Sequence, residues 1–273
     1  MTKISPKKSL GQNFLRSDKA LRQIIEAGDL EKTSGKKDLV IEIGPGEGVL
    51  TEKLLDTGAN VITIEKDNRL IPILEEKFSE QIKKGQLVIV HADVLELDIA
   101  KITANKKYKL IANIPYYITG MIMQMFLEAT HKPEKLVLLV QKEVAERIVA
   151  RDNKESILSL SVKLFGKPKI VDRVPRGAFH PMPTVDSAII LIDDIAKTYE
   201  ENIKNISKKN LNGFVPDFFK IIKKAFNQKR KQIGSTLGVT TEQIQSVNKN
   251  LTSKSRPEEL SVQDWIGLCD IIN

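Results

Sequence analysis

The amino-acid sequence predicts an α/β protein in which a mostly parallel, doubly wound sheet is followed by a small all-helical domain. Short β-branched runs alternate with amphipathic helical patterns up to about residue 193. A glycine-rich loop follows the first of these runs, and only helical periodicity returns beyond residue 210. Strands that alternate with helices are typical of a parallel sheet.

Six apolar, β-rich runs are the expected strands of this sheet. The first begins at Asp38 and meets the glycine cluster, after which leucines recur at helical spacing. Turn residues such as Gly58 and Gly85 separate the later runs from the helices before them. These later runs cover residues 60–65, 86–91, 108–113, 135–140 and 187–192.

The strand pattern is lost between Asp193 and Asn210, where charged and polar residues dominate. We therefore expect a larger domain over residues 1–198 and a small helical domain over residues 199–273. Residues 205–273 hold 11 basic and 6 acidic side chains, so this part is more basic per residue than the rest of the chain. The small domain is accordingly the expected RNA-binding part.

Composition limits the classes of function. With 273 residues and a net charge of +8, the chain suits a polyanionic partner or an acidic membrane surface. Cys269 is its single cysteine, so a reducing, cytoplasmic location is expected. His91, His131 and His180 have no metal-ligand spacing, and no metal is expected. Residues 110–127 carry no charge, but amides, tyrosines and a proline interrupt them, so we expect no membrane span.

The loop after the first strand contains Gly44, Gly46 and Gly48. Glycine allows a ligand to approach the backbone closely and tolerates the positive φ values of such turns. A dinucleotide-binding fingerprint needs glycine where this chain has Val49. With Glu42 before it, the loop has instead the Glu-x-Gly-x-Gly-x-Gly form of S-adenosylmethionine enzymes. A glycine turn that only packs a helix on a strand remains the alternative.

Two acidic residues follow the next strands. Glu65 ends the second strand, where a carboxylate can accept hydrogen bonds from both hydroxyls of a ribose. Asp93 lies just past the third strand and can accept from the amine of an adenine. The alternatives are a solvated carboxylate at Glu65 and a helix N-cap at Asp93.

The segment from Asn113 to Tyr116 is the predicted catalytic loop. An adenine amine is a poor nucleophile, and two acceptors for its hydrogens would expose the nitrogen lone pair. The Asn113 side-chain oxygen and the Ile114 carbonyl are candidates, because Pro115 biases Ile114 away from helical backbone angles. Tyr116 supplies a flat face for an extruded base. The alternative is a proline turn with a core tyrosine.

Together these motifs resemble the ribosomal RNA adenine dimethyltransferases, in particular their bacterial small-subunit type. The resemblance spans nearly the whole chain. It is carried by residues 8–15, 41–48, 61–65, 91–94, 113–119, 179–188 and 226–231.

The resemblance implies a Rossmann-like S-adenosylmethionine methyltransferase sheet and an N-terminal arm, residues 1–17, that closes over the cofactor. It implies that Asn113, Ile114, Pro115 and Tyr116 form the target-amine site, with Phe179 as a second aromatic side chain near the flipped base. The residues that it implies as contacts of S-adenosylmethionine are Gln12, Asn13, Leu15, Gly44, Gly46, Glu65, Asp93, Val94 and Asn113.

The resemblance also implies a reaction and a partner. The reaction is dimethylation of two adjacent adenosines in the 3′-terminal hairpin of 16S rRNA, linked to biogenesis of the small ribosomal subunit. No obligate protein partner and a monomeric state are expected. Ile114 is the residue found in the related 23S-directed resistance methyltransferases, so that target remains an alternative. A non-catalytic RNA-binding or ribosome-assembly factor is another.

The segment around residues 218–231 is the predicted RNA-binding helix. Phe218, Ile221, Ile222 and Ala225 form an apolar stripe, and lysines occupy the other side. A cationic helix face that contacts phosphates makes affinity for RNA dependent on salt. The alternative is a solvated helix face. The expected phosphate contacts, including two from the N-terminal arm, are Lys7, Lys8, Lys223, Lys224, Lys229, Arg230 and Lys231.

Overall fold

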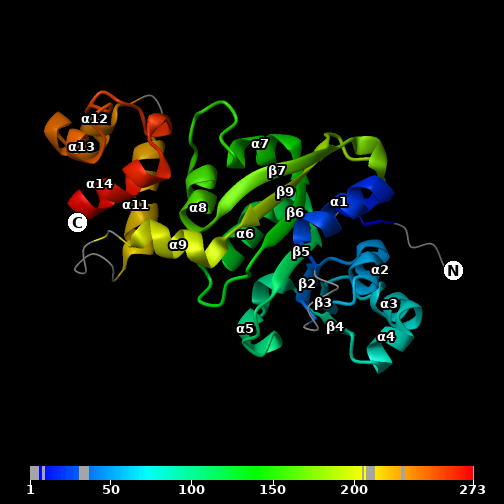
Figure 1. The fold of residues 1–273 in the computed structure, drawn as a ribbon. Helices are drawn as coiled ribbons and strands as arrows, with labels where there is room; N and C mark the ends of the chain where they lie inside the picture. Colours follow the sequence, from blue (N-terminus) through cyan, green and yellow to red (C-terminus); the bar gives the residue numbers. More distant parts are fainter. Residues whose placement is uncertain are drawn as a thin grey trace. The chain divides into compact units, whose positions relative to one another are not determined.

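A central sheet organises the N-terminal part of the chain in this computed structural model (Figure 1), which describes residues 6–7, 10–30, 37–204, 206, 213–228 and 231–272. Within these residues the sheet has seven strands in the order β4-β3-β2-β5-β6-β9-β7. The strands are β2 (Leu39–Ile43), β3 (Asn60–Glu65), β4 (Leu87–His91), β5 (Lys109–Asn113), β6 (Leu136–Gln141), β7 (Lys167–Val174) and β9 (Ser187–Asp193).

The pairing of these strands confirms the predicted α/β sheet. Strands β2 to β6 pair in parallel, and the register places Ile43 beside Ile64 and Asn113 beside Leu139. Strand β9 pairs antiparallel with β6, which the sequence did not reveal. The parallel strands bring the segments that follow β2, β3, β4 and β5 to the same edge of the sheet.

Helices flank the sheet and bury its apolar side chains. Helix α1 packs against β6 and β9, α2 against β3, and α3 and α4 against β4. The core includes Leu21, Ile24 and Leu54, each at most 1% exposed. Up to residue 148 the helices are α1 (Asp18–Gly28), α2 (Val49–Asp56), α3 (Ile71–Lys77), α4 (Ser79–Lys83), α5 (Ile99–Ile102), α6 (Thr119–Glu128) and α7 (Lys142–Ile148). The 3-10 turns are η2 (Val94–Glu96), η3 (Tyr116–Ile118) and, after β7, η4 (Arg176–Ala178).

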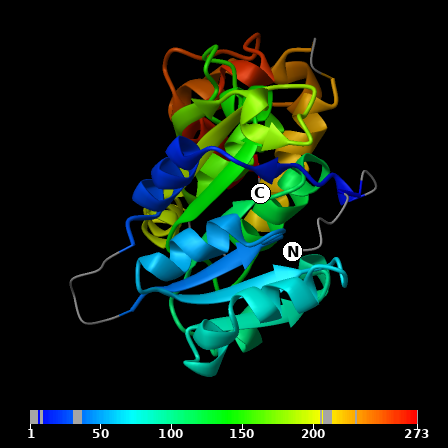
Figure 2. The same ribbon diagram turned by 90° about the vertical axis from the view of Figure 1, so that its right-hand side faces the viewer.

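The N-terminal arm runs from α1 across the end of β5 and the start of α6 (Figure 2). Its short strand β1 (Phe14–Leu15) pairs antiparallel with β8 (Phe179–His180). The Ser17 side chain accepts a hydrogen bond from the Ala20 backbone and caps α1, which fixes the point where the arm ends and the helix begins. The arm is therefore anchored at both ends of β1.

Contacts between residues divide the chain into two units. The first contains residues 1–145 and 168–195, and the second contains residues 146–167 and 196–273. The second unit thus includes a segment that lies between two strands of the sheet in the sequence. The functional boundary expected between residues 198 and 199 remains a prediction.

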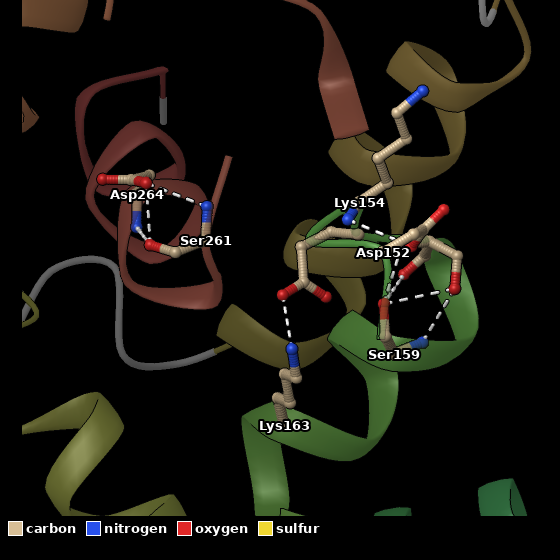
Figure 3. A network of polar contacts seen from close by, with 8 residues as sticks. Asp152, Lys154, Ser159, Lys163, Ser261 and Asp264 are labelled. Carbon is tan, nitrogen blue, oxygen red and sulfur yellow. Dashed lines mark hydrogen bonds and ion pairs between the residues drawn. The ribbon is translucent and has the colours of Figure 1, made fainter. Parts of the chain in front are cut away.

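The second unit is helical in its described residues. Trp265, Phe214 and Phe218 are fully buried, and the rings of Trp265 and Phe226 lie 6.1 Å apart. Figure 3 shows polar contacts within this unit. The Ser261 hydroxyl donates to Asp264 at the start of α14, and Lys163 of α8 pairs with Glu155, which precedes that helix. Its elements are α8 (Ile157–Phe165), α9 (Ile195–Ile203), α11 (Phe214–Phe226), α12 (Ile233–Leu237), α13 (Thr241–Val247), η5 (Pro257–Glu259) and α14 (Val262–Ile272).

The uncharged stretch from residue 110 to residue 127 is divided between β5, η3 and α6. Of the helices in the described residues, none combines the length and apolar character needed to cross a bilayer.

Candidate active site

A cavity of about 220 Å³ lies in the first unit, where the segments after β2, β3, β4 and β5 meet the N-terminal arm. The predicted cofactor contacts and the predicted catalytic loop all line it. These residues are Gln12, Asn13, Leu15, Gly44, Gly46, Glu65, Asp93, Val94, Asn113, Ile114, Pro115 and Tyr116.

The glycine loop forms one wall of the cavity with backbone alone. Gly44 and Gly46 have φ values of +66° and +58°, which L side chains rarely adopt. A Cβ atom at Gly46 would lie 2.8 Å from the ring of Phe14 in the N-terminal arm. At Gly44 nothing in the described structure lies within 4 Å of such an atom, so its side faces open space. The loop therefore lets both the arm and a ligand approach the main chain.

Glu65 is a buried carboxylate at the end of β3, with 5% of its surface exposed. Its Oε1 accepts from the Asp67 backbone at 2.8 Å, and its Oε2 accepts from the Gly46 backbone at 3.3 Å. Burial raises the pKa of Glu65, and these backbone hydrogen bonds oppose the rise. Each carboxylate oxygen has a second lone pair, so the group retains acceptor capacity for two hydroxyls.

Glu42 is more deeply buried, at 1% exposure, and lies beneath the same loop. Its Oε2 accepts from the Thr51 hydroxyl at 2.6 Å. Burial raises the pKa of Glu42 to about 8, the Thr51 hydrogen bond opposes the rise, and the nearby Glu65 adds to it. Glu42 is therefore mostly protonated at neutral pH in the folded protein.

Asp93 caps a 3-10 helix, as the alternative interpretation proposed, and it also lines the cavity, where its role as an acceptor for an adenine amine remains a prediction. Its Oδ1 accepts from the Leu95 backbone at 3.1 Å, at the start of η2. Its Oδ2 is 2.6 Å from the Lys66 ammonium, and this hydrogen bond is the main reason that the pKa of Asp93 is lowered. Asp93 is thus held ionised at the edge of the cavity.

The catalytic loop begins with Asn113, the last residue of β5. Its Nδ2 donates to the Asn13 carbonyl of the N-terminal arm at 3.1 Å. Because the amide nitrogen is committed to the arm, Oδ1 is the group that Asn113 has to accept a hydrogen bond from a ligand. Ile114 anchors the loop with a side chain that is 2% exposed, and Pro115 has an extended backbone with φ of −58° and ψ of 134°.

Two adjacent tyrosines, the last residue of the loop and the one after it, differ in exposure. The Tyr116 hydroxyl forms a 2.6 Å hydrogen bond with the Ser187 hydroxyl on β9, and burial raises the pKa of Tyr116. Tyr117 is 61% exposed, lines the cavity and packs against Gly11 of the arm. Tyr116 is therefore a tethered ring and Tyr117 a solvent-facing one.

Phe179 is not among the residues that line the cavity. It is 5% exposed, belongs to the apolar core, and pairs through its backbone with Leu15. Its stacking role near a flipped base remains a prediction.

The predicted RNA contacts divide between the arm and the second unit. Lys223, Lys224 and Lys231 are exposed, the first two on α11, whose opposite face is apolar and buried. Lys7 lies 3.8 Å from Asp67 in the first unit. Lys8, Lys229 and Arg230 lie outside the described residues. The described residues contain no group of three or more His, Cys, Asp or Glu side chains suited to a metal ion.

Sequence reasoning missed four residues that shape the site: Thr51, Asp67, Ser187 and Tyr117. Thr51 and Ser187 act as hydrogen-bond partners of Glu42 and Tyr116, and no local pattern marks such partners. Asp67 had a usable signal, because it lies two residues after Glu65 at the same strand end. Tyr117 directly follows the predicted loop and was overlooked beside Tyr116.

Solved structures that are similar to this chain identify the class of its fold. A 23S rRNA methyltransferase, ErmE, is 25% identical with a TM-score of 0.74, and the match covers 94% of this chain and 98% of the other. A dimethyladenosine transferase from Plasmodium falciparum is also 25% identical, with a TM-score of 0.72 over 93% and 95% of the two chains. The first unit therefore has the Rossmann-like fold of S-adenosylmethionine-dependent methyltransferases, as predicted.

Sequence comparisons specify the family. A family model described as "Ribosomal RNA adenine dimethylase" matches residues 4–273. A ribosomal RNA small subunit methyltransferase A from Dehalococcoides mccartyi is 40% identical over 97% of this chain and 88% of the relative. One from Clostridium botulinum is 36% identical over 97% and 93%. The chain belongs to the ribosomal RNA adenine dimethylase family, which confirms the resemblance found in its motifs.

Proposed function

We propose that this chain uses S-adenosylmethionine to add two methyl groups to the exocyclic amine of each of two adjacent adenosines in the 3′-terminal hairpin of 16S rRNA. One structural observation carries the chemistry. The Asn113 amide is held by the N-terminal arm so that its oxygen is available in the cavity that Glu65 and Asp93 also line. The names and high coverage of the small-subunit relatives support the choice of RNA.

The residues that line the cavity suit the proposed cofactor in their chemistry. The open side of Gly44 provides close access to the main chain. Glu65 and Asp93 supply acceptors for ribose hydroxyls and an adenine amine, in the order in which a nucleoside would present them along the strand ends. When bound, S-adenosylmethionine supplies an activated methyl group. An aligned approach of the amine lowers most of the barrier, and the methylated nitrogen, which is strongly acidic while positively charged, then releases its extra proton to solvent.

The chain's own residues prepare the target amine. The Asn113 side-chain oxygen and the Ile114 carbonyl accept its two hydrogens, which favours a pyramidal nitrogen and exposes the lone pair. The Tyr116 ring stacks on the extruded base, and its hydrogen bond to Ser187 limits rotation of that ring. Phe179, at the start of β8, is proposed as a second aromatic contact of the extruded base.

The second unit is proposed to bind the RNA through the phosphate backbone. The exposed lysines of α11 and Lys231 suit this role, and Lys7, Lys8, Lys229 and Arg230 are proposed as further phosphate contacts. In this proposal the functional boundary lies between residues 198 and 199, the partner is the small ribosomal subunit, and the protein acts as a cytoplasmic monomer without a metal ion.

Transfer of labelled methyl groups tests the proposed substrate directly. The protein should label small ribosomal subunits that lack these methyl groups and should leave naked 23S rRNA unlabelled. Mass spectrometry of the 16S product should show two adjacent dimethylated adenosines. Lack of transfer to either RNA, with binding retained, would indicate a non-catalytic RNA-binding factor.

A 23S-directed methyltransferase is the second candidate function. Ile114 and the TM-score of 0.74 to ErmE favour it. The same assay separates the two, because preferential labelling of 23S rRNA would replace the small-subunit proposal.

A further inference from the structure

Asp67 is a buried carboxylate that neither the motifs nor the proposed mechanism uses. Its side chain has no exposed surface, yet it forms an ion pair with the guanidinium of Arg69. Oδ1 accepts from the Arg69 side chain at 2.9 Å and from the Arg69 backbone at 3.2 Å. Oδ2 accepts from Arg69 at 2.6 Å and from Gln12 at 3.0 Å. The Arg69 hydrogen bonds hold the pKa of Asp67 well below its usual range.

Asp67 connects two walls of the cavity. Its backbone N–H donates to Glu65 Oε1 at 2.8 Å, which orients the proposed ribose acceptor. Its side chain accepts from Gln12 of the N-terminal arm, and the Gln12 oxygen accepts in turn from the Lys7 backbone at 2.8 Å. Asp67 alone therefore fixes both Glu65 and the part of the arm that faces it.

The next residue of the arm reaches the catalytic loop. Asn13 follows Gln12, and its carbonyl accepts the Asn113 amide. The hydrogen bond from Gln12 to Asp67 and the one from Asn113 to Asn13, joined by the peptide bond between Gln12 and Asn13, thus link Asp67 to the reacting end of the cavity. Breaking it at Asp67 would release the arm on the Gln12 side, while β1 pairing with β8 still holds the other side.

We propose that Asp67 is a positioning residue that, through Gln12, holds the N-terminal arm across the cavity and thereby sets the orientation of the Asn113 amide. The inference rests on the proposed function for its kinetic consequence. Its structural consequence, the order of the arm, can be measured without any methyl transfer.

The chain offers a matched control for Asp67. Asp172 also accepts from a glutamine, Gln23 Nε2 at 2.6 Å, and pairs with a cation, Lys19, at 2.9 Å. It belongs to the same unit and is not among the residues that line the cavity. Asp172→Asn therefore weakens a similar set of interactions at a site outside the cavity lining, where the side chain is 28% exposed against 0% for Asp67.

Hydrogen–deuterium exchange on the cofactor-free full chain tests the proposed order of the arm. In Asp67→Asn, the amides of residues 10–15 should exchange about tenfold faster than in the wild type, because their anchoring contact opens more often. Asp172→Asn should leave their exchange unchanged. Unaltered exchange in a folded Asp67→Asn protein would overturn the proposal.

Steady-state kinetics supply a second test. Asp67→Asn should raise KM for S-adenosylmethionine and lower kcat, each by about tenfold, since misplaced reacting groups lose alignment. Gln12→Met should produce the same changes without altering a buried charge, which keeps the test valid if Asp67→Asn folds poorly. The double variant should be little worse than either single variant. Additive losses would show that Asp67 does not act through Gln12.

The two sets of data distinguish this proposal from the proposed function. Faster exchange of the arm in a protein that methylates no RNA would retain the role of Asp67 and reject the function. If the wild-type protein methylates RNA and Asp67→Asn shows normal exchange of the arm, the function is retained and the role of Asp67 is rejected.

Discussion

At the scale of single residues, the site depends on how each polar side chain is oriented by its neighbours. The Asn113 amide can point its nitrogen or its oxygen into the cavity, and these two choices have opposite chemistry for an incoming amine. The Asn13 carbonyl selects between them, because it accepts only from the nitrogen. Reactivity at this position is therefore set by a backbone atom 100 residues earlier in the chain.

Asn113→Ala removes the acceptor for the target amine. We expect kcat for methyl transfer to fall by about 100-fold or more, the loss typical of removing one preorganised polar group from an active site. Affinity for RNA should stay within about twofold, since phosphate contacts dominate it. Rates follow from labelled-methyl transfer and affinities from filter binding. As a control, Gln86→Ala removes an amide that also donates to backbone carbonyls, those of Leu55 and Ala59, and should retain full activity.

The ionisation of Glu42 makes the stability of the fold depend on pH. Its pKa is about 8 in the folded protein against 4.5 for an ordinary glutamate, so the unfolded chain releases this proton first as pH rises. The stability that the protonated group retains below pH 4.5 is therefore lost progressively as the pH approaches 8.

Glu42→Gln keeps an acceptor for Thr51 and removes this titration. Between pH 5 and pH 8 the free energy of unfolding of the variant should rise relative to the wild type by about 1 kcal/mol for each pH unit. Urea denaturation at several pH values measures the difference. Parallel curves for the two proteins would mean that Glu42 ionises normally in the fold.

Sequence patterns located the site residues better than the partners that orient them. Gly44, Glu65, Asp93 and Asn113 could be predicted because each lies at the carboxyl end of a parallel strand or within two residues of it. Ser187 could not be linked to Tyr116, since their contact depends on β9 returning antiparallel beside β6. The direction of a late strand, and the strand beside which it pairs, are properties of the folded sheet. They leave no local pattern in the sequence.

At the scale of elements, apolar runs predicted strands well. The expected run of residues 60–65 is strand β3 with the same bounds, and residues 187–192 fall within β9. Strand β7 was missed because Lys167, Lys169, Asp172 and Arg173 break its apolar pattern, as is common where a strand packs on one side only. Helix α8 was not assigned to the second unit, since only its folded contacts connect it to α11 and α14.

Helix α11, together with Lys231 beyond its end, carries the prediction for RNA binding. Replacing Lys223, Lys224 and Lys231 with glutamine should weaken RNA binding and reduce the slope of log K against log salt by about 2, given about 0.7 to 0.9 per lost phosphate contact. Binding of S-adenosylmethionine, measured by calorimetry, should not change. A control with Lys83, Lys101 and Lys107 replaced, whose side chains are 74%, 85% and 79% exposed in the first unit, should keep the wild-type slope. An unchanged slope in the α11 variant would remove this helix from the RNA surface.

At the scale of the whole molecule, a ligand that fills the cavity should stabilise the unit that contains it. S-adenosylhomocysteine at about 100 times its dissociation constant adds about 2.7 kcal/mol, which for a unit of this size raises its melting temperature by about 5 °C or more. Scanning calorimetry should show the shift in the transition of the first unit. If saturating ligand leaves the thermogram unchanged, the cavity does not bind this nucleoside.

The division of the chain into units has a consequence for its synthesis and for truncated genes. Residues 146–167 are translated before the sheet is complete, yet their packing partners arrive only with residues 196–273. Until then α11 and α14 are not available to cover the apolar side chains of α8, among them Leu160 and Leu164. The ring of Phe165 also lacks Tyr199, on which it stacks in the folded protein. A stop codon after residue 195 would therefore yield no smaller working enzyme. It would yield a polypeptide in which the apolar face of α8 is exposed to water. Chaperones and proteases would bind such a polypeptide.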